Sequence, residues 1–127
     1  MASIFLVEDE FSLVRLYELV LTTFGHKIIA VANNGEEAVQ KYKKLLHKPD
    51  IIIMDHRMPI KNGIDATEEI LEINRDAKII FASADKEARE KAEMMGVLSF
   101  KTKPFSNEKL LRNIEKALKR TIYSSAT

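Results

Sequence analysis

The 127-residue sequence contains no cysteine, which excludes disulfide bonds, thiolate catalysis and cysteine-based zinc sites. It also lacks an excess of either charge, because 20 Lys and Arg residues against 19 Asp and Glu residues give a net charge of +1. Such a chain has no strong overall field to recruit nucleic acid or a membrane surface. No apolar run approaches the roughly 18–20 residues needed to cross a bilayer, and the N-terminus lacks a signal-peptide layout. We therefore expect a single soluble, cytoplasmic domain.

Short apolar runs alternate five times with segments of helical periodicity. We expect strands near residues 3–7, 27–32, 51–54, 78–82 and 97–101, and helices near residues 11–24, 35–47, 64–74, 85–95 and 106–122. Asn34, with Glu37 three residues later, is a capping-box arrangement for the second helix. The run from Ile51 to Met54 shows no alternation, which is typical of a central strand buried on both faces. Five such units predict an α/β fold with a parallel sheet between two layers of helices.

Chemically active side chains follow several of the predicted strands. Glu8 and Asp9 follow the first strand, Asp55 follows the third, Ser83 follows the fourth, and Lys103 comes shortly after the fifth. Each of them alone could be a helix-cap or loop residue, but the carboxyl ends of parallel strands meet at one edge of a sheet. Clustered carboxylates repel unless a cation neutralises them, and hard oxygen ligands favour Mg²⁺. The sequence therefore predicts a divalent-cation site beside a carboxylate that can act as a nucleophile.

The motifs around these residues resemble those of a response-regulator receiver domain, over nearly the full length of the chain. The resemblance is carried by the stretch MDHRMPIKNGIDA at residues 54–66, by Ser83-Ala84 and by Lys103-Pro104-Phe105. It implies a flavodoxin-like, doubly wound (βα)5 sandwich with a five-stranded parallel sheet in the order 2-1-3-4-5. We expect the receiver domain to occupy residues 1–122, with a short tail at residues 123–127, and the sequence shows no sign of an output domain in this chain.

The resemblance implies how the acidic residues are used. Asp55 corresponds to the phosphoacceptor, Asp9 to a direct ligand of Mg²⁺ (or Mn²⁺), and Glu8 to an acid that acts through metal-bound water. The backbone carbonyl of Arg57 would complete the protein ligands. The acidic site differs from the common pattern of the family at two positions. Glu8 replaces an aspartate, and Arg57 overhangs the phosphate site.

The resemblance also implies a switch beside the acceptor. Ser83 and Lys103 would contact the phosphoryl group, and Phe100 corresponds to the switch aromatic. Phe100 has no hydroxyl, so its inward rotamer can pack but cannot donate a hydrogen bond. The Lys103-Pro104 bond is at a position where the family commonly has a cis peptide.

The implied function is phosphorelay signalling. The domain would take a phosphoryl group from a phosphohistidine of a sensor kinase or phosphotransfer protein, in a Mg²⁺-dependent reaction, and then change the surface of its fourth helix, fifth strand and fifth helix. That surface would meet a downstream protein target, or a second copy in a weak homodimer of an otherwise monomeric protein. The domain would promote its own phosphorylation and dephosphorylation without being a metabolic enzyme, and would bind neither nucleic acid nor membrane directly.

Three other functions share this fold class. A phosphorylation-independent interaction module would not need the intact Asp9, Asp55, Ser83 and Lys103. A flavin-binding domain needs a phosphate loop after the first strand, where the acids of this chain repel phosphate. A phosphatase with an aspartyl nucleophile would place that nucleophile after the first strand and leave Asp55 unexplained.

The first predicted helix is unusually apolar. Leu13, Leu16, Tyr17, Val20 and Phe24 fall on one arc of this helix, whereas Phe11 and Leu19 fall on the opposite, polar side. Because Phe11 lies beside the acidic site, we expect it to contact a docking phosphodonor. The three histidines, His26, His47 and His56, are scattered along the chain, and we expect solvated surface positions for all of them.

Overall fold

The computed structural model describes the backbone of residues 1–126 and the side chains of residues 1–119. Strands and helices alternate strictly along the chain: β1 (Ser3–Val7), α1 (Phe11–Thr23), β2 (Lys27–Ala32), α2 (Gly35–Lys44), β3 (Ile51–Asp55), α3 (Gly63–Ile73), β4 (Ile79–Ser83), α4 (Lys86–Met95), β5 (Ser99–Thr102) and α5 (Asn107–Ala126). All strand pairs are parallel, and the order is β2-β1-β3-β4-β5. The predicted fold class and strand order are confirmed.

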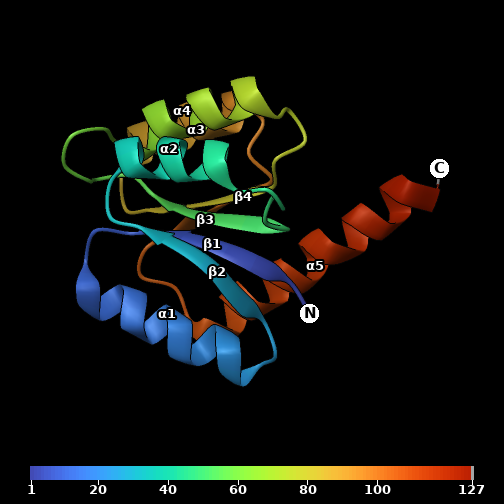
Figure 1. Cartoon of the computed structure of the whole chain (residues 1–127). Coiled ribbons are helices and arrows are strands. Elements are labelled where there is room, and N and C mark those ends of the chain that lie inside the picture. Colours follow the sequence, from blue (N-terminus) through green and yellow to red (C-terminus); the bar gives the residue numbers. More distant parts are fainter. Residues whose placement is uncertain (127) are drawn as a thin grey trace.

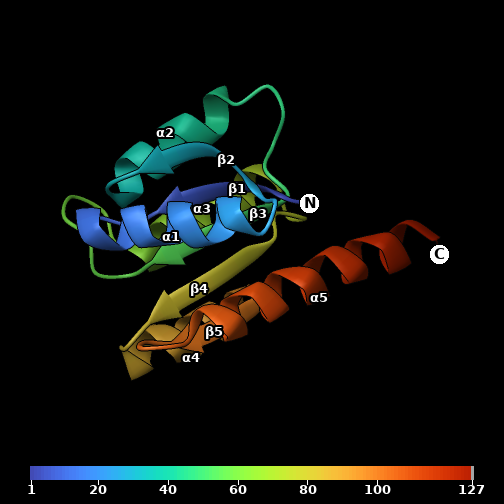
Figure 2. The ribbon, with the colours of Figure 1, turned by 90° about the horizontal axis from the view of Figure 1, so that it is seen from below.

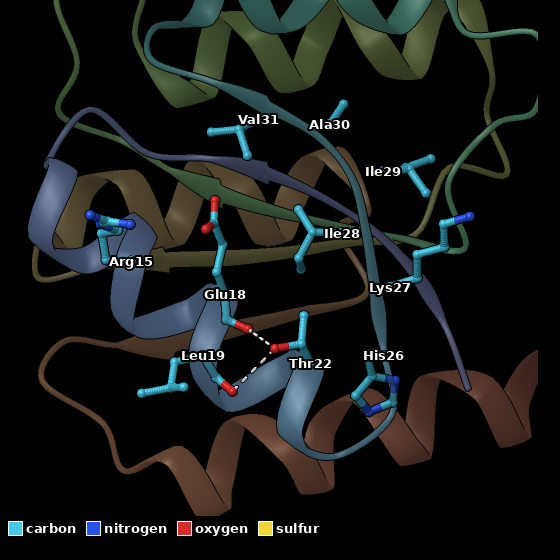
Figure 3. Close-up of a pocket in the computed structure, with 10 residues that line it drawn as sticks. All are labelled: Arg15, Glu18, Leu19, Thr22, His26, Lys27, Ile28, Ile29, Ala30 and Val31. Atoms are coloured by element: carbon cyan, nitrogen blue, oxygen red, sulfur yellow. Dashed lines mark hydrogen bonds between the residues drawn. The ribbon is translucent and has the colours of Figure 1, made fainter.

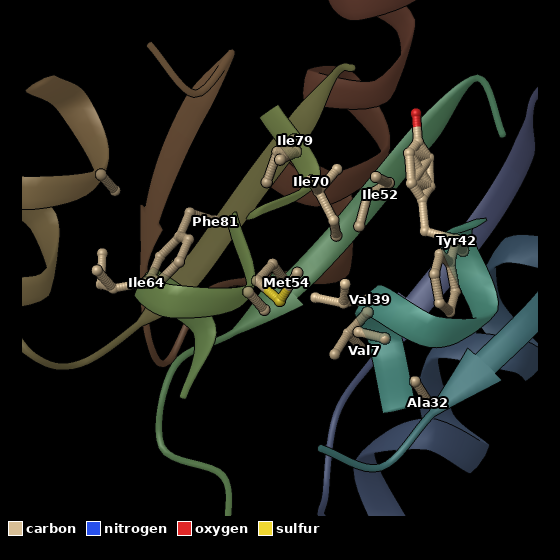
Figure 4. Packing of buried hydrophobic residues seen from close by; sticks show 14 of the residues in the cluster. Val7, Ala32, Val39, Tyr42, Ile52, Met54, Ile64, Ile70, Ile79 and Phe81 are labelled. Atoms are coloured by element: carbon tan, nitrogen blue, oxygen red, sulfur yellow. The ribbon is translucent and has the colours of Figure 1, made fainter. Parts of the chain in front are cut away.

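The helices cover both faces of the sheet, as Figure 1 shows: α2, α3 and α4 lie on one face, and α1 and α5 on the other. The strands supply alternate side chains to two separate cores. One core joins Val7, Ile52 and Phe81 to the α2–α4 layer (Figure 4), and the other joins Ile4 and Ile53 to the α1–α5 layer. Because β3 contributes to both cores, all five of its residues are buried, as its unbroken apolar run predicts.

Strand register decides which side chains meet at the carboxyl edge of the sheet. Val7 at the end of β1 is level with Met54 of β3, so Glu8 follows beside Asp55. Asp55 is in turn level with Ala82 of β4, and Ser83 is level with Thr102 of β5. The sheet therefore brings residues from four strands to one edge.

Helix ends follow local signals in most places. Gly25 and Gly96 both have φ 88°, a left-handed conformation that favours glycine after a helix. Asn34 caps α2 by accepting a hydrogen bond from the Glu37 N–H at 2.8 Å. The Glu37 side chain does not complete a capping box, because it pairs with Lys41 at 2.8 Å.

Three predicted boundaries differ from the structure by two residues or more. Helix α2 ends at Lys44, before the predicted residue 47, because Leu45 has an extended backbone with ψ 119°. Strand β5 begins at Ser99 rather than residue 97, and α5 continues to Ala126 rather than residue 122, so that its C-terminal part projects beyond the sheet (Figure 2). Residues 123–126 of the predicted tail are therefore helical, whereas Thr127 lies outside the described residues. None of the described helices is both long and apolar enough to cross a membrane.

The buried face of α1 is rotated from the predicted arc. Its buried residues are Val14, Tyr17 and Leu21, whereas Leu16 is 42% exposed and Phe24 is 63% exposed. Phe24 is the C-cap residue, where the chain leaves the helix, so the 100° spacing of helical residues does not predict the direction of its side chain. Apolar residues on nearly all sides of α1 made the sequence pattern ambiguous.

Candidate functional site

Three carboxylates meet at the carboxyl edge of the sheet. Glu8 directly follows β1, Asp55 is the last residue of β3, and oxygens of Glu8, Asp9 and Asp55 all lie within 4.8 Å of one another. Glu8 and Asp55 are only 3% and 8% exposed, whereas Asp9 is exposed to solvent. The structure thus brings together the three acids that the sequence predicted.

Lys103 bridges the two buried carboxylates. Its Nζ lies 2.8 Å from Glu8 Oε1 and 3.1 Å from Asp55 Oδ1. A cis peptide joins Lys103 to Pro104, and the Lys103 N–H donates to the Ser83 carbonyl at 3.1 Å, which fixes the start of this side chain beside β4. One ammonium group thus faces two carboxylates that would otherwise repel each other.

Burial and charge shift the proton affinities of this pair. Burial raises the pKa of Glu8 to about 7, and the charge of Asp55 adds to this rise, although the hydrogen bond from Lys103 opposes it. For Lys103, burial disfavours the charge, but the hydrogen bond to Glu8 and the nearby Asp55 charge outweigh burial and raise its pKa above its usual value. The ammonium form of Lys103 is therefore the form that occupies the site.

Ser83 ends β4 next to this cluster and is 4% exposed. Its Oγ accepts a hydrogen bond from the Asp85 N–H at 3.0 Å. Because this bond uses a lone pair of the hydroxyl, the hydroxyl proton stays available for an acceptor such as a phosphoryl oxygen.

The loop between β3 and α3 is pressed closely against Asp55. A Cβ added at Gly63 would lie 2.0 Å from the Asp55 carbonyl oxygen, so only glycine fits at the start of α3. The Gly63 N–H also donates to the His56 carbonyl at 2.9 Å. Within the loop, Ile60 has φ 72°, a rare and strained conformation for a β-branched residue.

The Arg57 side chain is directed toward α4 and is 83% exposed. Its guanidinium lies 3.6 Å from Asp85 Oδ2, and the same carboxylate caps α4 through the N–H groups of Glu87 and Ala88. Sequence reasoning did not single out Asp85. An aspartate directly before a helical pattern is an N-cap signal that could have identified it.

Two of the three histidines do not lie where the sequence suggested. The His56 side chain is only 15% exposed, its ring centroid is 5.9 Å from that of Phe81, and its Nδ1 is buried without a hydrogen-bond partner among the described residues. His26 Nδ1 accepts a hydrogen bond from the Ala2 N–H at 3.0 Å. Burial lowers the pKa of both imidazoles. The expectation of solvated positions is wrong for these two and correct for His47, which is exposed.

The remaining predicted residues lie around the acidic cluster. Phe11 begins α1 and is 72% exposed, with the Arg15 guanidinium 5.2 Å from its ring centroid. Phe100 of β5 is partly buried and packs against the core beneath α4. A hollow of about 480 Å³ lies between α1 and the segment after Lys103, and its lining includes Leu13, Leu16 and Phe105.

A larger hollow of about 730 Å³ lies away from this site, between α1 and the outer edge of β2 (Figure 3). Its lining includes Arg15, Glu18, Leu19 and Lys27, and none of the acidic-site residues. Lys41 Nζ donates to the Val31 carbonyl at the far end of β2, which blunts this edge of the sheet against strand pairing. This hollow is therefore separate from the acidic cluster at the carboxyl edge.

The donor set of the carboxyl edge fits a hard divalent cation. All three candidate ligands are carboxylates, and exposed Asp9 leaves one side of the cluster open to water, which suits Mg²⁺. The resemblance to receiver domains implies a Mg²⁺ ion at an acidic site of this kind, beside the aspartate that carries the phosphoryl group.

Comparisons with known proteins agree with this site. Residues 4–115 match the family model of the response regulator receiver domain. The chain is 37% identical over 118 residues to the chemotaxis protein CheY of Thermotoga maritima, covering 91% of this chain and 97% of that protein. It is 36% identical to the CheY protein of Bacillus subtilis, covering 91% and 96% of the two chains.

Solved structures show the same fold. CheY in the CheX-CheY-BeF3-Mg complex of Borrelia burgdorferi superposes with a TM-score of 0.86 at 30% identity, covering 91% of this chain and 88% of that chain. A receiver domain protein of Clostridium thermocellum, at 22% identity, shares the fold with a TM-score of 0.89, covering 97% and 98% of the two chains. The chain therefore belongs to the response regulator receiver family of two-component signalling.

Proposed function

We propose that the protein accepts a phosphoryl group from a phosphohistidine onto Asp55 and changes its interaction surface in response. The observation that carries this proposal is the buried Asp55 carboxylate, which has Lys103 Nζ at 3.1 Å and the oxygens of Glu8 and Asp9 within 4.8 Å. An acid with a purely structural role at the end of a strand does not need a nearby ammonium group and a cluster of cation-binding carboxylates, whereas an acceptor of a phosphoryl group does.

The transfer step follows from these groups. An oxygen of the Asp55 carboxylate attacks the phosphorus, the P–N bond breaks, and its electron pair stays on the imidazole nitrogen, which takes up a proton. The product is an acyl phosphate on Asp55. Lys103 neutralises negative charge on one side of the phosphoryl group, and the Ser83 hydroxyl donates a hydrogen bond to one of its oxygens.

We assign Asp9, Asp55 and the backbone carbonyl of Arg57 as direct ligands of Mg²⁺ (or Mn²⁺), and Glu8 as an acid that acts through metal-bound water. Two observations support this division: the Glu8 carboxylate already binds Lys103 at 2.8 Å, and Asp9 is exposed. The bound cation supplies positive charge that offsets the carboxylates and the incoming phosphoryl oxygens.

We assign the docking of the phosphodonor to the side of the acidic site formed by α1. A phosphohistidine must come into bonding distance of Asp55, so the protein that carries it has to cover the carboxyl edge. Phe11, 72% exposed, stands at the start of α1, and the hollow lined by Leu13, Leu16 and Phe105 lies beside Lys103. An apolar helix of a sensor kinase or phosphotransfer protein fits such a surface.

The readout of phosphorylation is assigned to α4, β5 and α5, and we assign Ser83, at the end of β4, and Phe100, in β5, as the residues that report the state of Asp55. This surface would meet a downstream protein target or a second copy of the chain. In the Borrelia burgdorferi complex, CheY is bound to CheX together with BeF3 and Mg²⁺. A cytoplasmic location and a receiver domain over residues 1–122 remain predictions.

Phosphate labelling tests the proposal. Incubation with phosphoramidate and Mg²⁺ should add one acid-stable, base-labile phosphoryl group, seen as a mass increase in the intact protein. Asp55→Asn should abolish the addition, and Asp65→Asn, at an exposed position in the first turn of α3, should leave it unchanged. Equal labelling of Asp55→Asn and the unmodified protein would contradict the assignment.

A further inference from the structure

The ring of Phe100 lies between an aromatic ring of the core and a cation on the surface. Its centroid is 5.6 Å from that of Phe81, with 18° between the ring planes. From α4, the guanidinium carbon of Arg89 lies 5.6 Å from the Phe100 centroid. Phe81 is fully buried, while the Arg89 side chain is 54% exposed, so the three groups form a stack that runs from the core to the surface.

Arg89 is itself held in place along α4. Its Nε lies 2.9 Å from Glu93 Oε1, one helical turn further on. A planar guanidinium that is anchored at one edge keeps a flat face available for an aromatic ring. Glu93 therefore orients Arg89 toward the stack.

Packing alone does not enclose Phe100 on the α4 side. A hollow of about 390 Å³ adjoins the ring, and its lining includes Ser83, Arg89 and Thr102. Phe100 has no hydroxyl, so no hydrogen bond anchors it at this position. Among the described residues, Arg89 is the cation that covers the ring.

We infer that Arg89 is a positioning residue that holds the Phe100 ring against Phe81 and so couples α4 to β5 beside Ser83. Every group in this stack belongs to the protein, so the stack does not need a phosphoryl group on Asp55. A movement of α4 that lifts Arg89 would release the ring toward the adjoining hollow. The part that Arg89 plays in switching depends on the proposed function, whereas the stack itself does not.

NMR of the Phe100 ring in the full-length protein tests the inference. With ring-labelled phenylalanine, the Phe100 signals are assigned by their loss in Phe100→Leu. Arg89→Met keeps an unbranched, flexible side chain that reaches as far as the Nε position and removes the cation, so the nuclear Overhauser contact between the two rings should weaken. We expect the population of the Phe100 rotamer packed against Phe81, relative to the rotamer turned away from it, to fall two- to fivefold. This change corresponds to the 0.5–1 kcal/mol of an exposed cation–π contact.

Two further variants separate the cation from a general effect of changing α4. Arg89→Lys should restore part of the ring contact, because an ammonium group is also attracted to an aromatic face. Arg112→Met removes a comparable arginine, paired with Glu108 one turn earlier in α5, and should leave the Phe100 signals unchanged.

Unchanged contacts between Phe100 and Phe81 in Arg89→Met would overturn the inference, as would equal losses in Arg112→Met. Because this comparison needs neither Mg²⁺ nor a phosphodonor, its outcome does not depend on phosphorylation of Asp55. The proposed function is tested apart from it, by the phosphoramidate labelling of Asp55.

Discussion

The two edges of the sheet use polar side chains in opposite ways. At the carboxyl edge, the side chains of Glu8, Asp55 and Lys103 bind one another, at 2.8 and 3.1 Å. At the amino edge, polar side chains bind the backbone instead: Asp50 Oδ2 accepts from the Ser3 N–H at 2.8 Å, and His26 accepts from the Ala2 N–H at 3.0 Å. Lys103 and Asp55 bind side chains and can exchange these partners with a ligand, although Glu8 Oε2 also accepts from the Glu10 N–H at 3.2 Å, whereas groups that complete backbone hydrogen bonds hold the fold together. We therefore expect variants of the carboxyl edge to change reactivity and variants of the amino edge to change stability.

The largest effect is expected from Lys103→Met. Loss of one charged group that faces the transferring phosphoryl group should slow labelling by phosphoramidate by about 100-fold or more. Glu8, with its pKa raised to about 7, can take up a proton when the ammonium is gone, which limits the loss of stability. The time course of the intact mass measures the rate. Lys101→Met, two residues away on β5, is the control, and equal rates for the two variants would contradict the role of Lys103.

A smaller effect is expected for the metal ligands. Asp9→Ala should weaken Mg²⁺ binding about tenfold or more, and by more than Glu8→Ala does, because a direct ligand contributes more than one acting through water. Isothermal titration calorimetry measures the affinities. Glu10→Ala alters the next acid in the sequence and should change little. If Glu8→Ala proves the more damaging, the two assignments are reversed.

Docking of the phosphodonor should depend on Phe11. Phe11→Ala should slow transfer from a histidine kinase about fivefold, the effect of losing roughly 1 kcal/mol at an interface, while labelling by phosphoramidate stays nearly unchanged. Leu19→Ala removes another exposed apolar side chain of α1, 66% exposed, and serves as the control. Equal losses with both donors would mean that Phe11 supports the fold rather than the partner.

At the amino edge, Asp50→Ala should act on stability alone. The Asp50 carboxylate accepts from the Ser3 N–H, while the Asp50 N–H donates to Ser3 Oγ at 2.9 Å, so the pair ties β1 to the start of β3. Its removal should lower the free energy of unfolding by about 1 kcal/mol without changing the rate of labelling. Urea unfolding measures the loss, with Asp76→Ala as an exposed control. A change in the labelling rate of Asp50→Ala would contradict the expectation that variants of the amino edge change stability alone.

The smallest effect is a pH dependence at His26. Burial, and after it the charge of the N-terminus, lower the pKa of His26 below its usual 6.5, so the unfolded chain binds more protons than the folded one. The stabilisation is present above pH 6.5 and is lost as the pH falls through the lowered pKa of the folded state. His26→Gln should therefore reduce the decrease in stability between pH 7.5 and 5.5, measured by urea midpoints. His47→Gln, at an exposed position, should leave this decrease in stability unchanged. If His26→Gln shows the same dependence of stability on pH as the unmodified protein, His26 is not its cause.

Much of this fold can be read from local sequence signals. The unbroken run from Ile51 to Met54 predicted the central strand, and the positions of Asp55 and Ser83 at strand ends predicted that both would lie at the same edge of the sheet. The order of the strands and the roles of the site residues came from the family resemblance, because spacing alone does not decide which strands are neighbours.

The features that sequence reasoning missed depend on contacts between distant residues. His56 is buried because Phe81, from the next strand, packs on it, and His26 is held by the N–H of Ala2. Neither contact has a periodic signature in the sequence. The rotation of α1 was missed for a different reason, because apolar residues on several sides of that helix fit more than one buried face.

The loop from His56 to Asn62 has consequences for how this protein can be re-engineered. Its two ends are fastened together by the bond from the Gly63 N–H to the His56 carbonyl, and the Lys61 carbonyl accepts from the Gly35 N–H at 2.9 Å. With its ends already closed, a lengthened loop adds little entropy cost, since each doubling of loop length costs only about 0.6 kcal/mol. We therefore expect a recognition sequence grafted at Ile60 to leave Asp55 in register, with loss of the bond from the Lys61 N–H to the Pro59 carbonyl at 2.8 Å, and replacing the strained Ile60 by glycine is the first step of such a graft.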